Sequence, residues 1–181
     1  MRDDGSPLLG VKVSKCAPDG PDEFLVQATI EKTAEHIYAL VDWADERNKW
    51  RQTGDEVTAL DEEGRHFRLV VQFMRDVQFD YEVIEASKPH VYACVCVPTP
   101  SVGHLVRSDE HYRIEPVGET QSLVTYTMTA HFESGLGERQ SAEVRRNMTI
   151  ACHNTLAKLK ANAEHGVGTV EAFENTRLMP M

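Results

Sequence analysis

The sequence predicts an α+β domain, in which a seven-stranded antiparallel sheet wraps around one long carboxyl-terminal helix. Between residues 53 and 132, hydrophobic residues repeat with the period of about two that is typical of strands. Short turn-forming segments separate these strands, and connections of that length favour antiparallel hairpins. Residues 141–165 contain neither proline nor glycine and repeat with helical spacing, which predicts the long helix.

The first ordered segment, residues 24–31, alternates in the way expected of a strand with one buried face. Its apolar positions are Phe24, Val26, Ala28 and Ile30. Thr33 then occupies the N-cap position of a first helix that runs to about Asp42. A second short helix is expected over residues 43–50.

Six further strands follow, and together with the opening strand they make the expected seven. They are predicted over residues 53–60, 64–74, 78–87, 91–97, 106–115 and 123–132. The helix over residues 141–165 ends before Gly166, which suits the position after a helix. At 1.5 Å per residue it would be about 37 Å long, enough to cross a curved sheet.

Three parts are expected along the chain. Residues 1–23 are rich in glycine and proline and predict a flexible arm that docks one short strand near residues 8–13. Residues 24–166 form the domain, and residues 167–181 form a tail. A chain of 181 residues is consistent with one domain.

Composition and motifs exclude several function classes. A net charge of −10 disfavours binding to nucleic acid, and the absence of a long apolar segment argues against membrane insertion and a signal peptide. We therefore expect a cytoplasmic protein whose four cysteines are reduced thiols. The eight histidines show no metal-binding spacing, and the sequence lacks nucleotide-binding glycine motifs, so we expect no metal and no cofactor.

Three segments resemble the START-like (SRPBCC) superfamily, which includes polyketide cyclases and dehydratases, birch-pollen-type allergens and lipid-transfer domains. The segments are ATIEKTAEHIYALVDWADERNKW, DYEVIEASKPHVYACV and HYRIEPVGETQSLVTYTMTAHF. They are similar to the superfamily's opening strand and helix, its central hairpin and its last hairpin. The resemblance covers about residues 24–165 and implies the helix-grip fold with an internal cavity, but members differ in what they do with that cavity.

Strand alternation and the helical face identify the side chains that would line such a cavity. The candidate ligand-binding residues are Phe67, Leu69, Phe79, Tyr81, Tyr112, Tyr126, Met128, Arg145, Met148 and Cys152. Aromatic rings and methionines suit a flat or greasy small molecule, and phenol groups could orient a polar edge of it. The alternative for each of these residues is that it simply fills the core.

Glu110 is the candidate catalytic residue. Strict alternation places it on the same face as Tyr112 and Ile114, which points it inward. A β-bulge at residues 108–110 would turn it outward, and this is the alternative that we favour. An inward carboxyl could act as a general acid or base.

Two function classes follow. In the first, the protein binds a small hydrophobic or aromatic molecule, polyketide-like or lipid-like, without a covalent step. In the second, it is an enzyme resembling polyketide cyclases and dehydratases that uses a cavity carboxyl and phenol pair. A third class, a cochaperone-like interaction domain, would need an exposed apolar patch. The expected partner is the small hydrophobic molecule, and a homodimer is left open.

Overall fold

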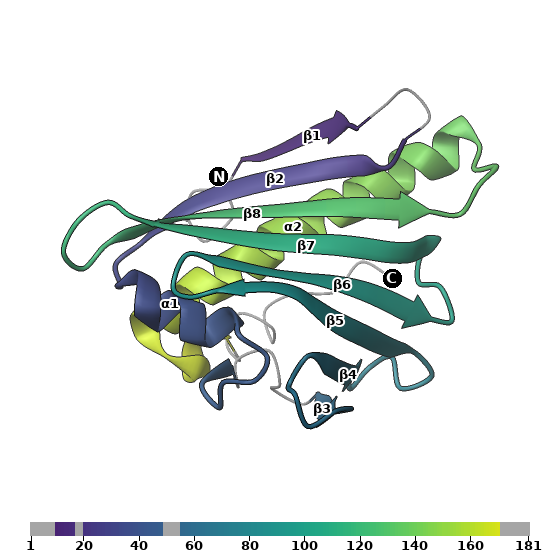
Figure 1. Ribbon diagram of the computed structural model, residues 1–181. Helices are drawn as coiled ribbons and strands as arrows, with labels where there is room; N and C mark the ends of the chain where they lie inside the picture. The colour runs from purple at the N-terminus through teal and green to yellow at the C-terminus, as the bar shows by residue number, and fades with distance from the viewer. Residues whose placement is uncertain (1–9, 17–19, 49–54, 171–181) are drawn as a thin grey trace.

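The computed structural model of the protein describes residues 10–16, 20–48 and 55–170. One antiparallel sheet is packed against a long helix, α2 (Glu138–His165), and a short helix, α1 (Ala34–Val41), lies at one end of the sheet (Figure 1). The strands are β1 (Val11–Lys15), β2 (Asp22–Ile30), β3 (Glu56–Ala59), β4 (His66–Val70), β5 (Gln78–Ser87), β6 (Val91–Thr99), β7 (Leu105–Pro116) and β8 (Ser122–Phe132). Their order in the sheet is β1-β2-β8-β7-β6-β5-β4-β3.

The α+β class, the antiparallel pairing and the long carboxyl-terminal helix are confirmed. The predicted count of seven strands is wrong, because the sheet has eight. The additional strand is β1, which overlaps the short docked strand expected near residues 8–13. It pairs with β2 from Val11 opposite Val26 to Lys15 opposite Asp22. Part of the amino-terminal arm is therefore an ordered edge of the sheet.

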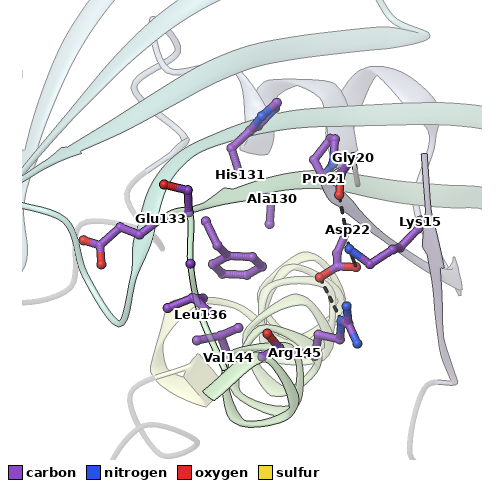
Figure 2. A pocket seen from close by; sticks show the side chains of 14 residues that line it. Lys15, Gly20, Pro21, Asp22, Ala130, His131, Glu133, Leu136, Val144 and Arg145 are labelled. Atoms are coloured by element: carbon purple, nitrogen blue, oxygen red, sulfur yellow. Dashed lines mark hydrogen bonds and ion pairs between the residues drawn. The ribbon is translucent and has the colours of Figure 1, made fainter. Parts of the chain in front are cut away.

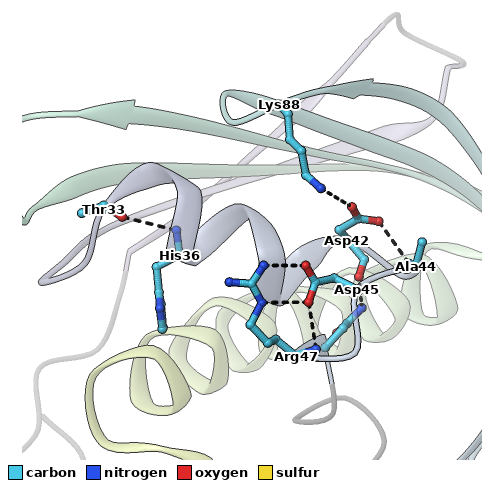
Figure 3. Close-up of polar contacts among 8 residues, drawn as sticks. Thr33, His36, Asp42, Ala44, Asp45, Arg47 and Lys88 are labelled. Carbon is cyan, nitrogen blue, oxygen red and sulfur yellow. Dashed lines mark hydrogen bonds and ion pairs between the residues drawn. The ribbon is translucent and has the colours of Figure 1, made fainter.

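The first helix begins as predicted, since the Thr33 side chain accepts a hydrogen bond from the His36 N–H at 3.3 Å. The second short helix expected over residues 43–50 is wrong over residues 43–47, which form turns and a bend, whereas Asn48 has 3₁₀-helical conformation. The carboxylates of Asp42 and Asp45 each accept a hydrogen bond from the backbone N–H two residues later (Figure 3). Such turns compete with helical hydrogen bonding. Residues 49 and 50 lie outside the described parts.

The strand predicted over residues 64–74 is shorter, since β4 ends at Val70. The Met74 N–H donates to the Val71 carbonyl at 3.0 Å, which closes a turn in place of the strand. Phe73 in that turn is 63% exposed, so the inward face of Phe67 and Leu69 does not continue to it.

Helix α2 is attached to β2 at both ends. Arg145 Nε donates to Asp22 Oδ2 at 2.9 Å near the start of the helix. Near its end, Lys160 Nζ donates to the Thr29 carbonyl at 2.6 Å, and Glu164 Oε1 accepts from the Glu31 N–H at 2.9 Å. The helix consequently lies over the β2 side of the sheet.

No helix among residues 10–16, 20–48 and 55–170 is both long enough and apolar enough to cross a membrane.

The end of α2 provides a test of the fold. Gly166 caps the helix with φ 88° and ψ 171°, a backbone conformation that is essentially restricted to glycine. We expect Gly166→Ala to lower the free energy of unfolding by about 1–3 kcal/mol. Gly168→Ala is the control, because Gly168 has open space and no positive φ. Urea unfolding of both variants would contradict the prediction if their stabilities were equal.

Candidate functional site

The inner face of the sheet, which packs toward α2, is built from aligned inward positions of successive strands. One row across five strands consists of Val83, Cys94, Glu110, Met128 and Phe24. The next row consists of Tyr81, Cys96, Ser108, Ala130 and Asp22. All ten side chains are buried or nearly so. Strict alternation along each strand therefore accounts for both rows.

One part of this inner face is close-packed core. Tyr112 and Tyr126 are both 0% exposed, and their ring centroids lie 4.7 Å apart. Cys152 from α2 is also 0% exposed, and its thiol contacts the Met128 sulfur at 3.8 Å. Four of the predicted ligand-binding residues thus form two contacting pairs in the buried core.

A second part of the inner face is less covered. Phe67 and Tyr81 are buried, but their inward neighbours Leu69 and Phe79 are only half-buried. Trp43 packs on this group, and its ring centroid lies 6.2 Å from that of Phe67 and 4.7 Å from that of Tyr81. We call these five residues the apolar patch. Helix α2 packs chiefly against β2 instead, and its predicted ligand contact Met148 is half-buried.

The segment after α1 holds Trp43 in place. The backbone N–H of Trp43 donates a hydrogen bond to Tyr92 Oη at 3.0 Å. Lys88 Nζ lies 3.4 Å from the carboxylate of Asp42 (Figure 3). The Arg47 guanidinium donates two hydrogen bonds to Asp45, which lower the pKa of that carboxyl to about 2. These turns therefore fix the indole over the apolar patch, a role that periodicity in the sequence could not reveal.

Glu110 faces inward. It is 6% exposed, and its register with Cys94 and Met128 is regular. The favoured alternative, a bulge at residues 108–110 that turns it outward, is wrong, because the irregularity lies between Leu105 and Arg107. Residues 107–116 keep strict alternation because each pairs with its β8 partner in order.

The charge of Glu110 acts on two buried thiols. Burial, and then the negative charge of Glu110, raise the pKa of Cys96 to about 12. The same two causes raise the pKa of Cys152. Hydrogen bonding from Tyr81 and Ser108 to Cys96 opposes part of this shift. The carboxyl, a phenol, a hydroxyl and two thiols are therefore brought together beside the apolar patch.

Arg145 lies elsewhere. It lines a pocket of about 510 Å³ between the β1–β2 hairpin, the end of β8 and the first turns of α2 (Figure 2). Its partner Asp22 is buried and was not predicted, although it has the same alternation parity as Phe24 and Val26. A buried carboxylate needs a charged partner. The inward position of Asp22 in the strand was therefore the sequence signal that could have predicted an ion pair with a basic residue.

Within the described ranges, no group of three or more His, Cys, Asp or Glu side chains is arranged to hold a metal ion. The polar groups of the inner face near the apolar patch include Glu110, Tyr81 and Ser108.

Residues 22–164 match the model of a family described as polyketide cyclase/dehydrase and lipid transport. The chain belongs to this family. Its match begins at β2 and ends one residue before the end of α2, so it includes both rows of the inner face. No curated protein matches the chain.

Solved structures share the fold of this polyketide cyclase/dehydrase and lipid transport family member. A START superfamily protein from Mycobacterium smegmatis has a TM-score of 0.54 and 16% identity, covering 83% of this chain and 98% of that one. A protein from Arthrobacter aurescens has a TM-score of 0.58 and 14% identity, covering 90% and 92%. A conserved protein of unknown function from Enterococcus faecalis has a TM-score of 0.57 and 11% identity, covering 92% of each chain. These likenesses confirm the START-like fold.

The raised pKa of Cys96 predicts an alkaline loss of stability. The folded thiol keeps its proton up to about pH 12, whereas the unfolded thiol ionises near its ordinary value of 9.0. The unfolded state is thus favoured as pH rises above 9. Between pH 8 and 10, wild type should lose about 1 kcal/mol more unfolding free energy than Cys96→Ala.

Cys16→Ala is the matched control, since Cys16 is exposed. Urea unfolding at both pH values should give this control the wild-type dependence. The same pH dependence in Cys96→Ala and wild type would contradict the prediction.

Proposed function

We propose that the protein binds a small hydrophobic or aromatic molecule, polyketide-like or lipid-like, at the apolar patch. The observation that carries this proposal is that Leu69 and Phe79 face inward and yet stay half-buried. Inward apolar side chains are normally covered, and incomplete cover leaves room for an apolar ligand to complete the burial. The family description, which joins polyketide and lipid chemistry, supports the same class of ligand.

The patch suits a flat ligand. Half-buried Phe79 lies in the patch with the buried rings of Trp43, Phe67 and Tyr81. Aromatic rings favour offset-stacked or edge-to-face contacts with an aromatic molecule. Ser108 lies in the same row of the inner face as Tyr81, and Glu110 lies in the next row. They would supply polar groups to orient a ketone or hydroxyl.

A phenylalanine pair tests binding. N-phenyl-1-naphthylamine, a neutral apolar dye, should bind wild type with increased fluorescence. Phe79→Ala should weaken this binding about tenfold, because it removes a ring that would contact the ligand. Phe73→Ala makes the same chemical change at a side chain that is 63% exposed, and should leave binding unchanged.

Equal effects of the two substitutions would contradict the proposed site. A thermal melt of each variant separates loss of binding from loss of folding.

A second candidate function is catalysis of the polyketide cyclase/dehydratase type. The observation that favours it is the inward carboxyl of Glu110, 6% exposed, beside the apolar patch. As a carboxylate it would accept the proton from a carbon between two carbonyls, and the resulting enolate would attack a ketone carbon of the same chain. The protonated carboxyl would return this proton to the alkoxide formed at the attacked carbon, which gives a hydroxyl. The regenerated carboxylate would then take the second proton of the same carbon and pass it to that hydroxyl, which leaves as water as the new double bond forms.

Glu110→Gln separates the two functions. It keeps the size of the side chain and removes the acid–base group, so we expect N-phenyl-1-naphthylamine to bind as in wild type. If the protein cyclises a synthetic poly-β-ketone thioester, the rate of aromatic product formation should fall about 10²-fold or more. Glu143→Gln changes an exposed glutamate on α2 and serves as the control.

Wild-type product formation by Glu110→Gln would exclude the acid–base role. No product from the wild-type protein would leave binding as the function.

A further inference from the structure

The pocket at the start of α2 is separate from the apolar patch. It has a volume of about 510 Å³, which lies within the size range of small-molecule sites. Its walls come from the β1–β2 hairpin, the last residues of β8, the connection to α2 and the first turns of that helix (Figure 2). None of the five residues of the apolar patch lines it.

The charged groups of this pocket are unequally exposed. Asp22 is buried, with 6% of its side chain exposed, and two cations meet it: Arg145 Nε at 2.9 Å and Lys15 Nζ at 3.6 Å. The side chains of Arg145 and Lys15 are 39% and 40% exposed. Arg145 and Lys15 share the single carboxylate of Asp22, so the three side chains together carry a net positive charge. Because Asp22 is buried, the charges that a ligand can reach are those of Arg145 and Lys15.

The other acid at the pocket is engaged outside it. Glu133 accepts hydrogen bonds from Ser101 at 2.6 Å and pairs with His104 at 2.8 Å. Figure 2 shows its carboxylate directed away from Asp22 and Arg145. Within the described parts of the chain, Asp22 is the side-chain partner of Arg145 through Nε, which leaves both terminal nitrogens of the guanidinium for a ligand.

Part of the remaining wall is apolar. Ala130 and Phe132 from β8, Leu136 from the connection and Val144 from α2 line the same pocket. A fixed cation pair facing an apolar wall matches a molecule with an anionic head and a hydrocarbon body.

We propose that this pocket binds a small organic carboxylate through Arg145 and Lys15, with its hydrocarbon part against Phe132, Leu136 and Val144. The site is additional to the proposed apolar patch and does not depend on it. It is also a feature of this chain beyond the family match, since β1, Lys15 and Gly20 precede residue 22, where that match begins.

Octanoate is the probe, and octylamine and 1-octanol are its charge controls. Isothermal titration calorimetry should show octanoate binding that weakens with added salt, because the contact is ionic and partly exposed. The two controls should bind at least about tenfold more weakly, since neither offers an anion to Arg145. Equal affinity for octanoate and octylamine would overturn the proposal.

Two pairs of variants locate the site. Arg145→Gln should weaken octanoate binding about tenfold, whereas Arg146→Gln, an exposed arginine next to it on α2, should not. Because Arg145→Gln also deprives buried Asp22 of a partner, Lys15→Gln provides a milder second test. Lys12→Gln is its control on the same strand. Equal losses in a variant and its control would overturn the proposal.

Asp22→Asn gives a result of opposite sign. It removes the carboxylate that competes for Arg145, so octanoate binding should become several-fold tighter in a variant that still shows a cooperative thermal melt. Unchanged or weaker binding by this folded variant would contradict the proposal. Phe79→Ala should leave octanoate binding unchanged, so failure of the apolar patch and failure of this pocket are distinguished.

Discussion

The two-ended attachment of α2 to β2 is the constraint on which the arrangement of the molecule depends. The strand from Asp22 to Glu31 spans about 30 Å at 3.3 Å per residue, and the helix from Arg145 to Glu164 spans about 29 Å at 1.5 Å per residue. The matched lengths let an ion pair form at one end and hydrogen bonds to backbone groups form at the other. The helix is thereby fixed beside β2 along most of its length.

This placement divides the inner face into two environments. Where α2 packs on β2 and β8, the phenol rings of Tyr112 and Tyr126 are excluded from water and fill the core. Toward β4 and β5, Trp43 covers part of the face, and Leu69 and Phe79 remain half-buried. The same attachment also places Arg145 against Asp22, so one contact both positions the helix and forms a wall of the second pocket.

Local pattern was enough to predict most elements, because alternation, the Thr33 cap and the Gly166 stop are properties of short segments. It failed where a contact distant in sequence or a turn outweighed the pattern. Residues 43–47 have helical composition, yet the carboxylates of Asp42 and Asp45 form turns. Arg145 lines the pocket at the start of α2 and not the apolar patch because α2 packs against β2. The hydrophobic periodicity of α2 or of β2 alone does not show that the two elements pack together. The inward position of Glu110 followed from alternation alone, and the added bulge was unnecessary.

Asp22 and Glu110 are both buried acidic residues on the inner face, but their surroundings differ. The charge of Asp22 is balanced by Arg145 and Lys15, so it stabilises the packing of the helix. Glu110 instead lies beside thiols, and its charge adds to burial in raising the pKa of Cys96 to about 12. Thiols with such pKa values stay protonated near neutral pH and are poor nucleophiles. Covalent thiol chemistry is therefore disfavoured at the inner face, and Cys96 and Cys152 act as apolar lining.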